Sequence, residues 1–105
     1  MPGQSATLIK DIHSLLAQEP ALTPLAHVED VLTVGYAHAL ALEAQQLRLE
    51  RRLRLLAHDP GDAAGAGAAA TSELTEQLGD VESELSHLRT VLVTLRDRVR
   101  ELRAA

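Results

Sequence analysis

The chain has 105 residues and a formal net charge of −5, and 46% of its residues are hydrophobic but only 1% aromatic. One domain fits this length, and the hydrophobic fraction is too high for a wholly disordered chain. Because the chain contains no cysteine, disulfides, thiolate metal sites and a cysteine nucleophile are excluded. Aromatic rings usually supply much of a compact core. A chain that relies on Leu, Ala and Val, with Arg and Glu, is instead typical of helices and coiled coils.

The first predicted element is a short helix over residues 5–18. Its apolar residues Leu8, Ile12 and Leu15 recur at helical spacing, and polar residues lie between them. The helix is expected to end at Glu19, because the proline that follows disfavours helical geometry at the residue before it.

A long helix is predicted over residues 24–58. Thr23 can cap its start, and Pro24 suits the first helical position. Only Gly35 interrupts the pattern before the Asp-Pro-Gly sequence that begins at Asp59. A helix of about 35 residues would be about 50 Å long.

A second long helix is predicted over residues 72–103, after a flexible linker at 59–70. The linker is rich in alanine and glycine, which indicates an exposed connection. Thr71 or Ser72 can cap the helix, and acidic residues in its first turn suit the helix dipole.

The strongest pattern in the chain is a heptad seam in the last helix. Leucine or valine occupies every a and d position over four heptads: Leu74, Leu78, Val81, Leu85, Leu88, Leu92, Leu95, Val99 and Leu102. The helix over 24–58 has a similar, less regular seam, in which Gln46 is a lone polar residue. Gln46 either fixes the register or lies at a hydrated edge. The two seams match in length when the chain folds back on itself, which predicts an antiparallel coiled-coil hairpin.

The charge pattern favours the same orientation. Four arginines and one acid lie between residues 48 and 58, whereas residues 73–84 contain five acids and no base. Antiparallel pairing sets these blocks side by side and places Glu29 and Asp30 near the arginines at 98–103. Parallel pairing would set like charges together, so the charges select orientation more than they add stability.

Several apolar residues lie outside the seams and require further packing partners. Either the short helix folds back and covers some of them, or chains associate into a larger helical bundle. The short helix is too short to cover the whole hairpin, which favours an oligomer or a complex with another protein. The predicted partner-binding residues are Leu8, Ile12, Leu15, Val34, Tyr36, Leu40, Leu47, Val91 and Val93.

Other chemistry has weaker support. The arginine-rich sequence at residues 48–54 suggests nucleic-acid binding, but the net charge is negative and stacking rings are missing. His38 and His87 could approach across the hairpin, yet no two histidines have the spacing of a helical metal pair. No phosphate loop, acid pair or nucleophile motif indicates catalysis.

The sequence therefore predicts an all-α, non-enzymatic protein that acts through protein–protein interaction. We expect a coiled-coil hairpin with a short N-terminal helix, which completes an oligomeric bundle as a self-associating or hetero-oligomeric subunit, scaffold or adaptor. A nucleic-acid-associated regulator is the alternative. No cofactor, metal or small-molecule substrate is expected. No targeting segment or membrane span is recognisable, so an intracellular, cytoplasmic protein is expected.

Overall fold

A computed structural model describes residues 2–19, 23–58 and 64–104 of the chain. Three helices form in chain order: α1 at Pro2–Ala17, α2 at Leu25–His58 and α3 at Ala64–Ala104. Residues 18, 19, 23 and 24 are the only described residues outside these helices, which confirms the prediction of an all-α protein. The molecule is elongated, with extents of 62 × 18 × 15 Å.

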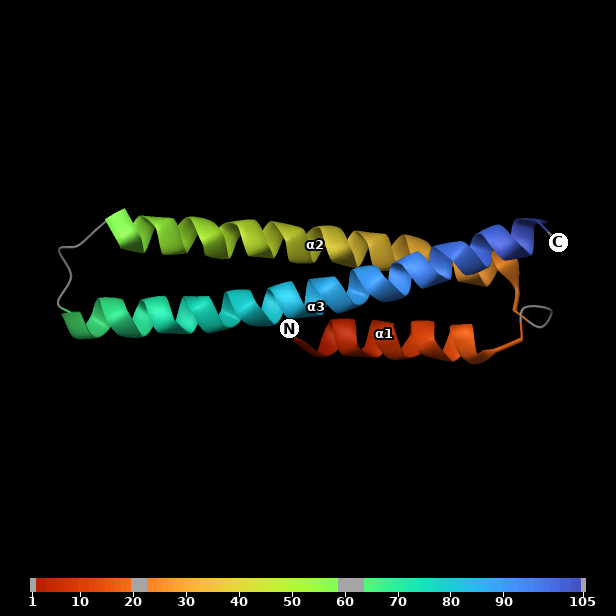
Figure 1. Ribbon diagram of the computed structural model, residues 1–105, viewed down its shortest axis with the longest axis horizontal. Coiled ribbons are helices and arrows are strands. Elements are labelled where there is room, and N and C mark those ends of the chain that lie inside the picture. The colour runs from red at the N-terminus through yellow and green to blue at the C-terminus, as the bar shows by residue number, and fades with distance from the viewer. Residues whose placement is uncertain (1, 20–22, 59–63, 105) are drawn as a thin grey trace.

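The two long helices lie side by side and run in opposite directions (Figure 1). Ion pairs connect them at two levels, between Glu43 and Arg89 and between Glu29 and Arg103. The shorter α1 lies beside the C-terminal half of α3 (Figure 1). At 1.5 Å per residue α1 is about 24 Å long, so it spans about half of the ~51 Å length of α2.

The core is a long apolar stripe rather than a globular centre. Its fully buried members come mostly from α3, which packs against both α2 and α1. The buried hydrophobic residues are Ile9, Ile12, Leu15, Val28, Ala39, Leu42, Leu49, Val81, Leu85, Leu88, Val91, Leu92, Leu95 and Val99. Aliphatic side chains, mostly leucine and valine, thus fill the described core without aromatic residues.

The start of α3 differs from the sequence-based boundary. The predicted linker at 59–70 is helical from Ala64 onwards, and α3 begins eight residues before Ser72. Thr71 therefore lies inside the helix, where its carbonyl accepts a hydrogen bond from the hydroxyl of Thr75. Alanine has the highest helix propensity, and the alanines between the glycines offset the cost of Gly65 and Gly67. Residues 59–63, the rest of the predicted linker, lie outside the described residues.

Polar contacts hold α1 against the long helices. The Arg98 guanidinium donates to the carbonyl oxygens of Leu16 and Gln18, each at 3.2 Å, and so satisfies the C-terminal end of α1. Near the other end, the buried hydroxyl of Ser5 lies 2.6 Å from Nε2 of His38 on α2. These contacts fix both ends of α1 to its own chain.

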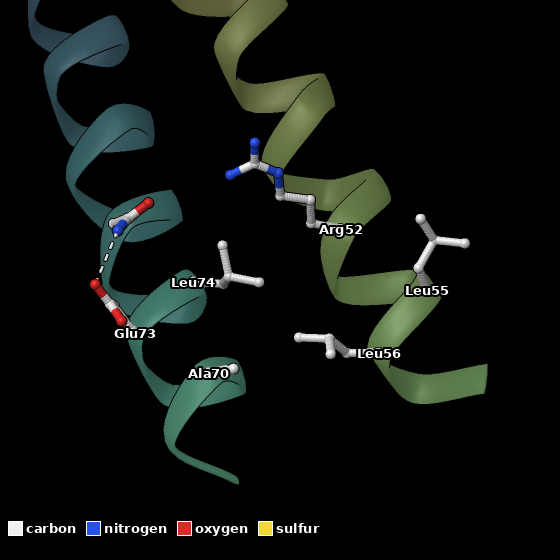
Figure 2. Close-up of a pocket in the computed structure, with 7 residues that line it drawn as sticks. Arg52, Leu55, Leu56, Ala70, Glu73 and Leu74 are labelled. Carbon is white, nitrogen blue, oxygen red and sulfur yellow. Dashed lines mark hydrogen bonds between the residues drawn. The ribbon is translucent and has the colours of Figure 1, made fainter. Parts of the chain in front are cut away.

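Beyond the N-terminus of α1, only two helices continue toward the α2–α3 connection. Figure 2 shows Leu56 and Leu74 pointing toward one another there, while Leu55 points away from α3. Leu56 and Leu74 are only partly buried, unlike the heptad residues nearer the middle. The molecule is therefore a three-helix bundle at one end and a two-helix pair at the other.

Candidate partner-binding surface

The structure divides the nine predicted partner-binding residues into a covered and an exposed group. Ile12, Leu15 and Val91 are buried, and Leu8 packs against the core. These four residues are covered because α1 folds back onto its own α2 and α3. They are therefore not part of an exposed surface. The sequence left two arrangements open, and the structure contains the one in which α1 folds onto its own chain. The other five residues are exposed: Val34, Tyr36, Leu40, Leu47 and Val93.

The exposed residues of α2 do not all lie on one side. His38 contacts Ser5 and therefore faces α1. Tyr36 and Leu40 each lie two residues from His38, and residues two apart are separated by about 200° around a helix. They consequently lie on the side of α2 away from α1.

Val34 belongs to the other side of α2. It lies four residues before His38, so it shares the face of α2 that looks toward α1, although its own side chain is 57% exposed. Leu47, in contrast, follows Leu40 by seven residues, or two turns, and continues the stripe of Tyr36 and Leu40.

The same division applies to α3. Val91 is buried beside α1, and Arg98, seven residues further along, donates to the α1 carbonyl oxygens. Val93 lies two residues from Val91 and so points to the opposite side. Tyr36, Leu40, Leu47 and Val93 therefore share one side of the α2–α3 pair, which we name the α1-free face.

A groove runs between α2 and α3 on the α1-free face. Apolar residues form its floor and walls, and charged residues from both helices flank them. It is lined by Tyr36, Ala39, Leu40, Glu43, Arg89, Leu92, Val93 and Arg96. Leu40 is 65% exposed, an unusual environment for a leucine in the middle of a long helix.

The charged residues of this groove are not equivalent. Glu43 and Arg89 form an ion pair across it. Arg96 has one outer nitrogen 3.7 Å from a carboxylate oxygen of Asp97, whereas its Nε is buried without a hydrogen-bond partner among the described residues. The Arg96 side chain as a whole is 42% exposed, so its outer guanidinium nitrogens remain accessible to a bound group.

The arginine block of α2 is not paired as the sequence suggested. Within the described part of the chain, none of Arg48, Arg51, Arg52 and Arg54 forms an ion pair with an acid. Arg52 points into the space between the helices in Figure 2, but the nearby Glu73 accepts a hydrogen bond from Gln77. The blocks lie on neighbouring helices without an ion pair between their described residues, whereas the expected proximity of Glu29 and Arg103 is confirmed by their ion pair.

The two histidines considered as a metal pair have different partners. His38 lies against Ser5, and the ring of His87 lies 6.1 Å from that of His13. Among residues 2–19, 23–58 and 64–104, no group of three or more His, Asp or Glu side chains is arranged to hold a metal ion. None of the helices, over the same ranges, is both long and apolar enough to cross a membrane.

Sequence reasoning missed the charged residues of the groove. Arg89 and Arg96 are seven residues apart on α3, as are Tyr36 and Glu43 on α2. This two-turn spacing places each pair on one side of its helix, so the sequence alone could have predicted that the members of each pair share a face. The missing information was the position of α1, which decides the side that stays exposed.

Comparison of the chain with protein-family models, with curated proteins and with solved structures found no match.

Proposed function

We propose that this chain is a non-enzymatic protein–protein interaction module, acting as a subunit, scaffold or adaptor of a larger assembly. In this proposal α2 and α3 form an antiparallel coiled-coil hairpin, and α1 braces one side of it. The α1-free face binds helices of a partner, either another copy of the chain or a different protein. Apolar stripes of this kind bind amphipathic helices by helix-in-groove packing.

The observation that carries the proposal is the exposed apolar stripe. Leu40, Leu47 and Val93 are large, exposed and grouped on one side, and Tyr36 adds the only aromatic ring of the chain. Exposed apolar residues grouped on one face and interspersed with charged residues are typical of a protein-binding surface. Full burial of such a side chain contributes about 1.5–3 kcal/mol, which favours binding of an apolar partner at this stripe.

The proposal is tested by site-specific photo-cross-linking in the native source. A photoreactive residue replaces Leu40 or Leu47, and the matched control carries it at Val34, which is comparably exposed but lies on the other side of α2. We expect discrete cross-linked products from positions 40 and 47 that are weak at position 34 and are lost when Val93→Asp is added. Equal products at all three positions would contradict a specific face.

A second candidate function is favoured by the unpaired arginines of α2. Arg48, Arg51, Arg52 and Arg54 are exposed and available to phosphate groups. A nucleic-acid-associated regulator would bind DNA or RNA with an affinity that falls steeply as salt concentration rises. Fluorescence anisotropy with labelled single- and double-stranded oligonucleotides tests it, with the double variant Arg51→Gln/Arg54→Gln as the comparison. No binding at low salt would remove this candidate.

A further inference from the structure

We propose that the occupant of the α1-free face is a second copy of this chain, aligned so that α2 of each copy packs against α3 of the other. Two hairpins would then form a four-helix bundle, with the two α1 helices on its outer sides. This inference rests on the proposed function and names the partner and its orientation.

The two interhelical ion pairs define which residues lie at the same level of the hairpin. Glu43 lies level with Arg89. Seven residues along each helix from that pair, Tyr36 lies level with Arg96, and between these levels Leu40 lies level with Val93. One groove is lined by all four of these residues, Tyr36, Arg96, Leu40 and Val93, which agrees with this register.

Two hairpins can be stacked face to face by a two-fold axis in two ways. An axis along the helices places α2 against the partner's α3, with every level kept. An axis across the helices places α2 against the partner's α2 and reverses the levels. The charges on the α1-free face discriminate between these arrangements.

In the aligned arrangement, the charges alternate. Glu43 meets the partner's Arg89, while its own Arg89 meets the partner's Glu43, so each carboxylate lies between two guanidinium groups. Apolar residues meet at the next level, where Leu40 packs against the partner's Val93. Leu47 then lies over the partner's Ser86, whose small side chain leaves room for it.

In the crosswise arrangement, the same charges repel. Burial of both Leu40 and Leu47 requires Leu40 to face the partner's Leu47. The midpoint between these positions falls beside Glu43, so the two copies of Glu43 would meet, and the two copies of Arg89 would meet next to them. Juxtaposed like charges at an interface cost free energy and suppress the wrong association.

The aligned arrangement also gives Arg96 a partner. Its side chain lines the groove and is 42% exposed, so its guanidinium can be reached from this face. The partner's Tyr36 would lie at the level of this guanidinium, where an aromatic ring can cover a cation through its π face. The sole tyrosine of a chain without Phe or Trp would thus lie within the interface, and aromatic residues and arginine are enriched in interfaces.

The absence of cysteine permits a direct test of this geometry. Single variants Leu40→Cys and Val93→Cys are mixed as unfolded chains, refolded together and oxidised mildly. We expect one predominant disulfide, which joins position 40 of one copy to position 93 of the other. Mixing Leu40→Cys with Leu47→Cys, or with the control Val34→Cys, is expected to give little product. A predominant link between positions 40 and 47 would overturn the aligned arrangement.

Sedimentation equilibrium or light scattering tests the second copy itself without any disulfide. We expect the wild-type chain to have twice its monomer mass of 11.3 kDa. Leu40→Asp and Val93→Asp should halve the mass, whereas Val34→Asp should leave it unchanged, with helicity checked by circular dichroism in each case. A wild-type monomer at millimolar concentration would overturn this inference. If photo-cross-linking at position 40 then captured a different protein, the proposed function would stand without the dimer. If it captured no protein, the proposed function and the dimer would both fail.

Discussion

Gly35 of α2 lies so close to Leu92 of α3 that a methyl group added at position 35 would overlap the Leu92 side chain. Leu92 is almost fully buried, so its side chain has little room to move away. At this level the two long helices therefore pack so closely that only the hydrogen of glycine fits. Gly79, on the exposed surface of α3, has nothing within 4 Å of such a methyl group.

This difference predicts opposite effects of the same substitution. Gly79→Ala should raise the free energy of unfolding by about 1 kcal/mol, because alanine is the better helix former. Gly35→Ala gains the same propensity, but overpacking costs about 1–3 kcal/mol, so we expect a net loss of stability. Urea denaturation followed by circular dichroism measures both. Equal stabilisation by the two variants would contradict the close approach.

The contact between Arg98 and the end of α1 predicts a local effect. Arg98→Met should cost about 1.5–3 kcal/mol, because the carbonyl oxygens of Leu16 and Gln18 lose a charged donor. Hydrogen exchange should show the loss of protection concentrated in α1. Arg100→Met is the control, since Arg100 is largely exposed and, among the described residues, pairs only with Asp97 at 4.0 Å. Uniform loss of protection over all three helices would contradict a specific role in holding α1.

Burial of α1 against the long helices predicts a large cost for Ile12→Ala. The Ile12 side chain is 0% exposed, and truncation of such a residue costs about 2–5 kcal/mol through lost burial and the cavity that remains. Val34→Ala, at an exposed apolar position, should change stability by less than about 0.5 kcal/mol. Thermal and urea unfolding measure the two. Similar small effects would mean that α1 does not pack as the structure has it.

The ion pairs between α2 and α3 should contribute little to stability. Glu29→Gln and Arg103→Gln each remove the same exposed pair and should lower the free energy of unfolding by less than about 1 kcal/mol. High salt should reduce the difference from wild type further, because it screens exposed charges. A loss of several kcal/mol from either variant would show that charge, rather than apolar packing, dominates this end of the molecule.

The change from three helices to two predicts uneven protection along the long helices. Toward the α2–α3 connection, the inward residues Leu53, Leu56, Leu74 and Leu78 are only partly buried. Amides in residues 50–58 and 67–78 should therefore exchange faster than those around Leu88 and Leu95, because local opening exposes fewer buried contacts. Hydrogen exchange read by mass spectrometry checks this. Equal protection along α3 would contradict it.

The heptad pattern was sufficient to predict the helices, but it could not assign faces. In sequence, Val91 and Val93 are equivalent apolar residues outside the seam, and only the position of α1 makes one buried and the other exposed. The sequence favoured a second chain as the cover, because α1 is too short to cover the whole length of the two long helices. In the structure α1 covers about half of it, which is enough to bury Ile12 and Val91.

The arginine block shows a second limit of the sequence. A count of charges along the chain places basic and acidic blocks side by side but ignores their direction around each helix. Arg51 and Arg54 follow Leu47 at helical spacing and so lie toward the α1-free face. Asp80 and Glu84 instead line a groove with residues of α1, on the other side of α3. Opposite charges at the same level can thus point apart.

Tyr36 is an intrinsic spectroscopic probe of the molecule. It is the sole aromatic chromophore among residues that otherwise absorb little near 280 nm, and it is exposed on the α1-free face rather than within the core. Its fluorescence should therefore change little when an unassociated chain unfolds and more when that face is covered. In this chain, the position of the intrinsic spectroscopic probe makes it more sensitive to association than to the folding of a single copy.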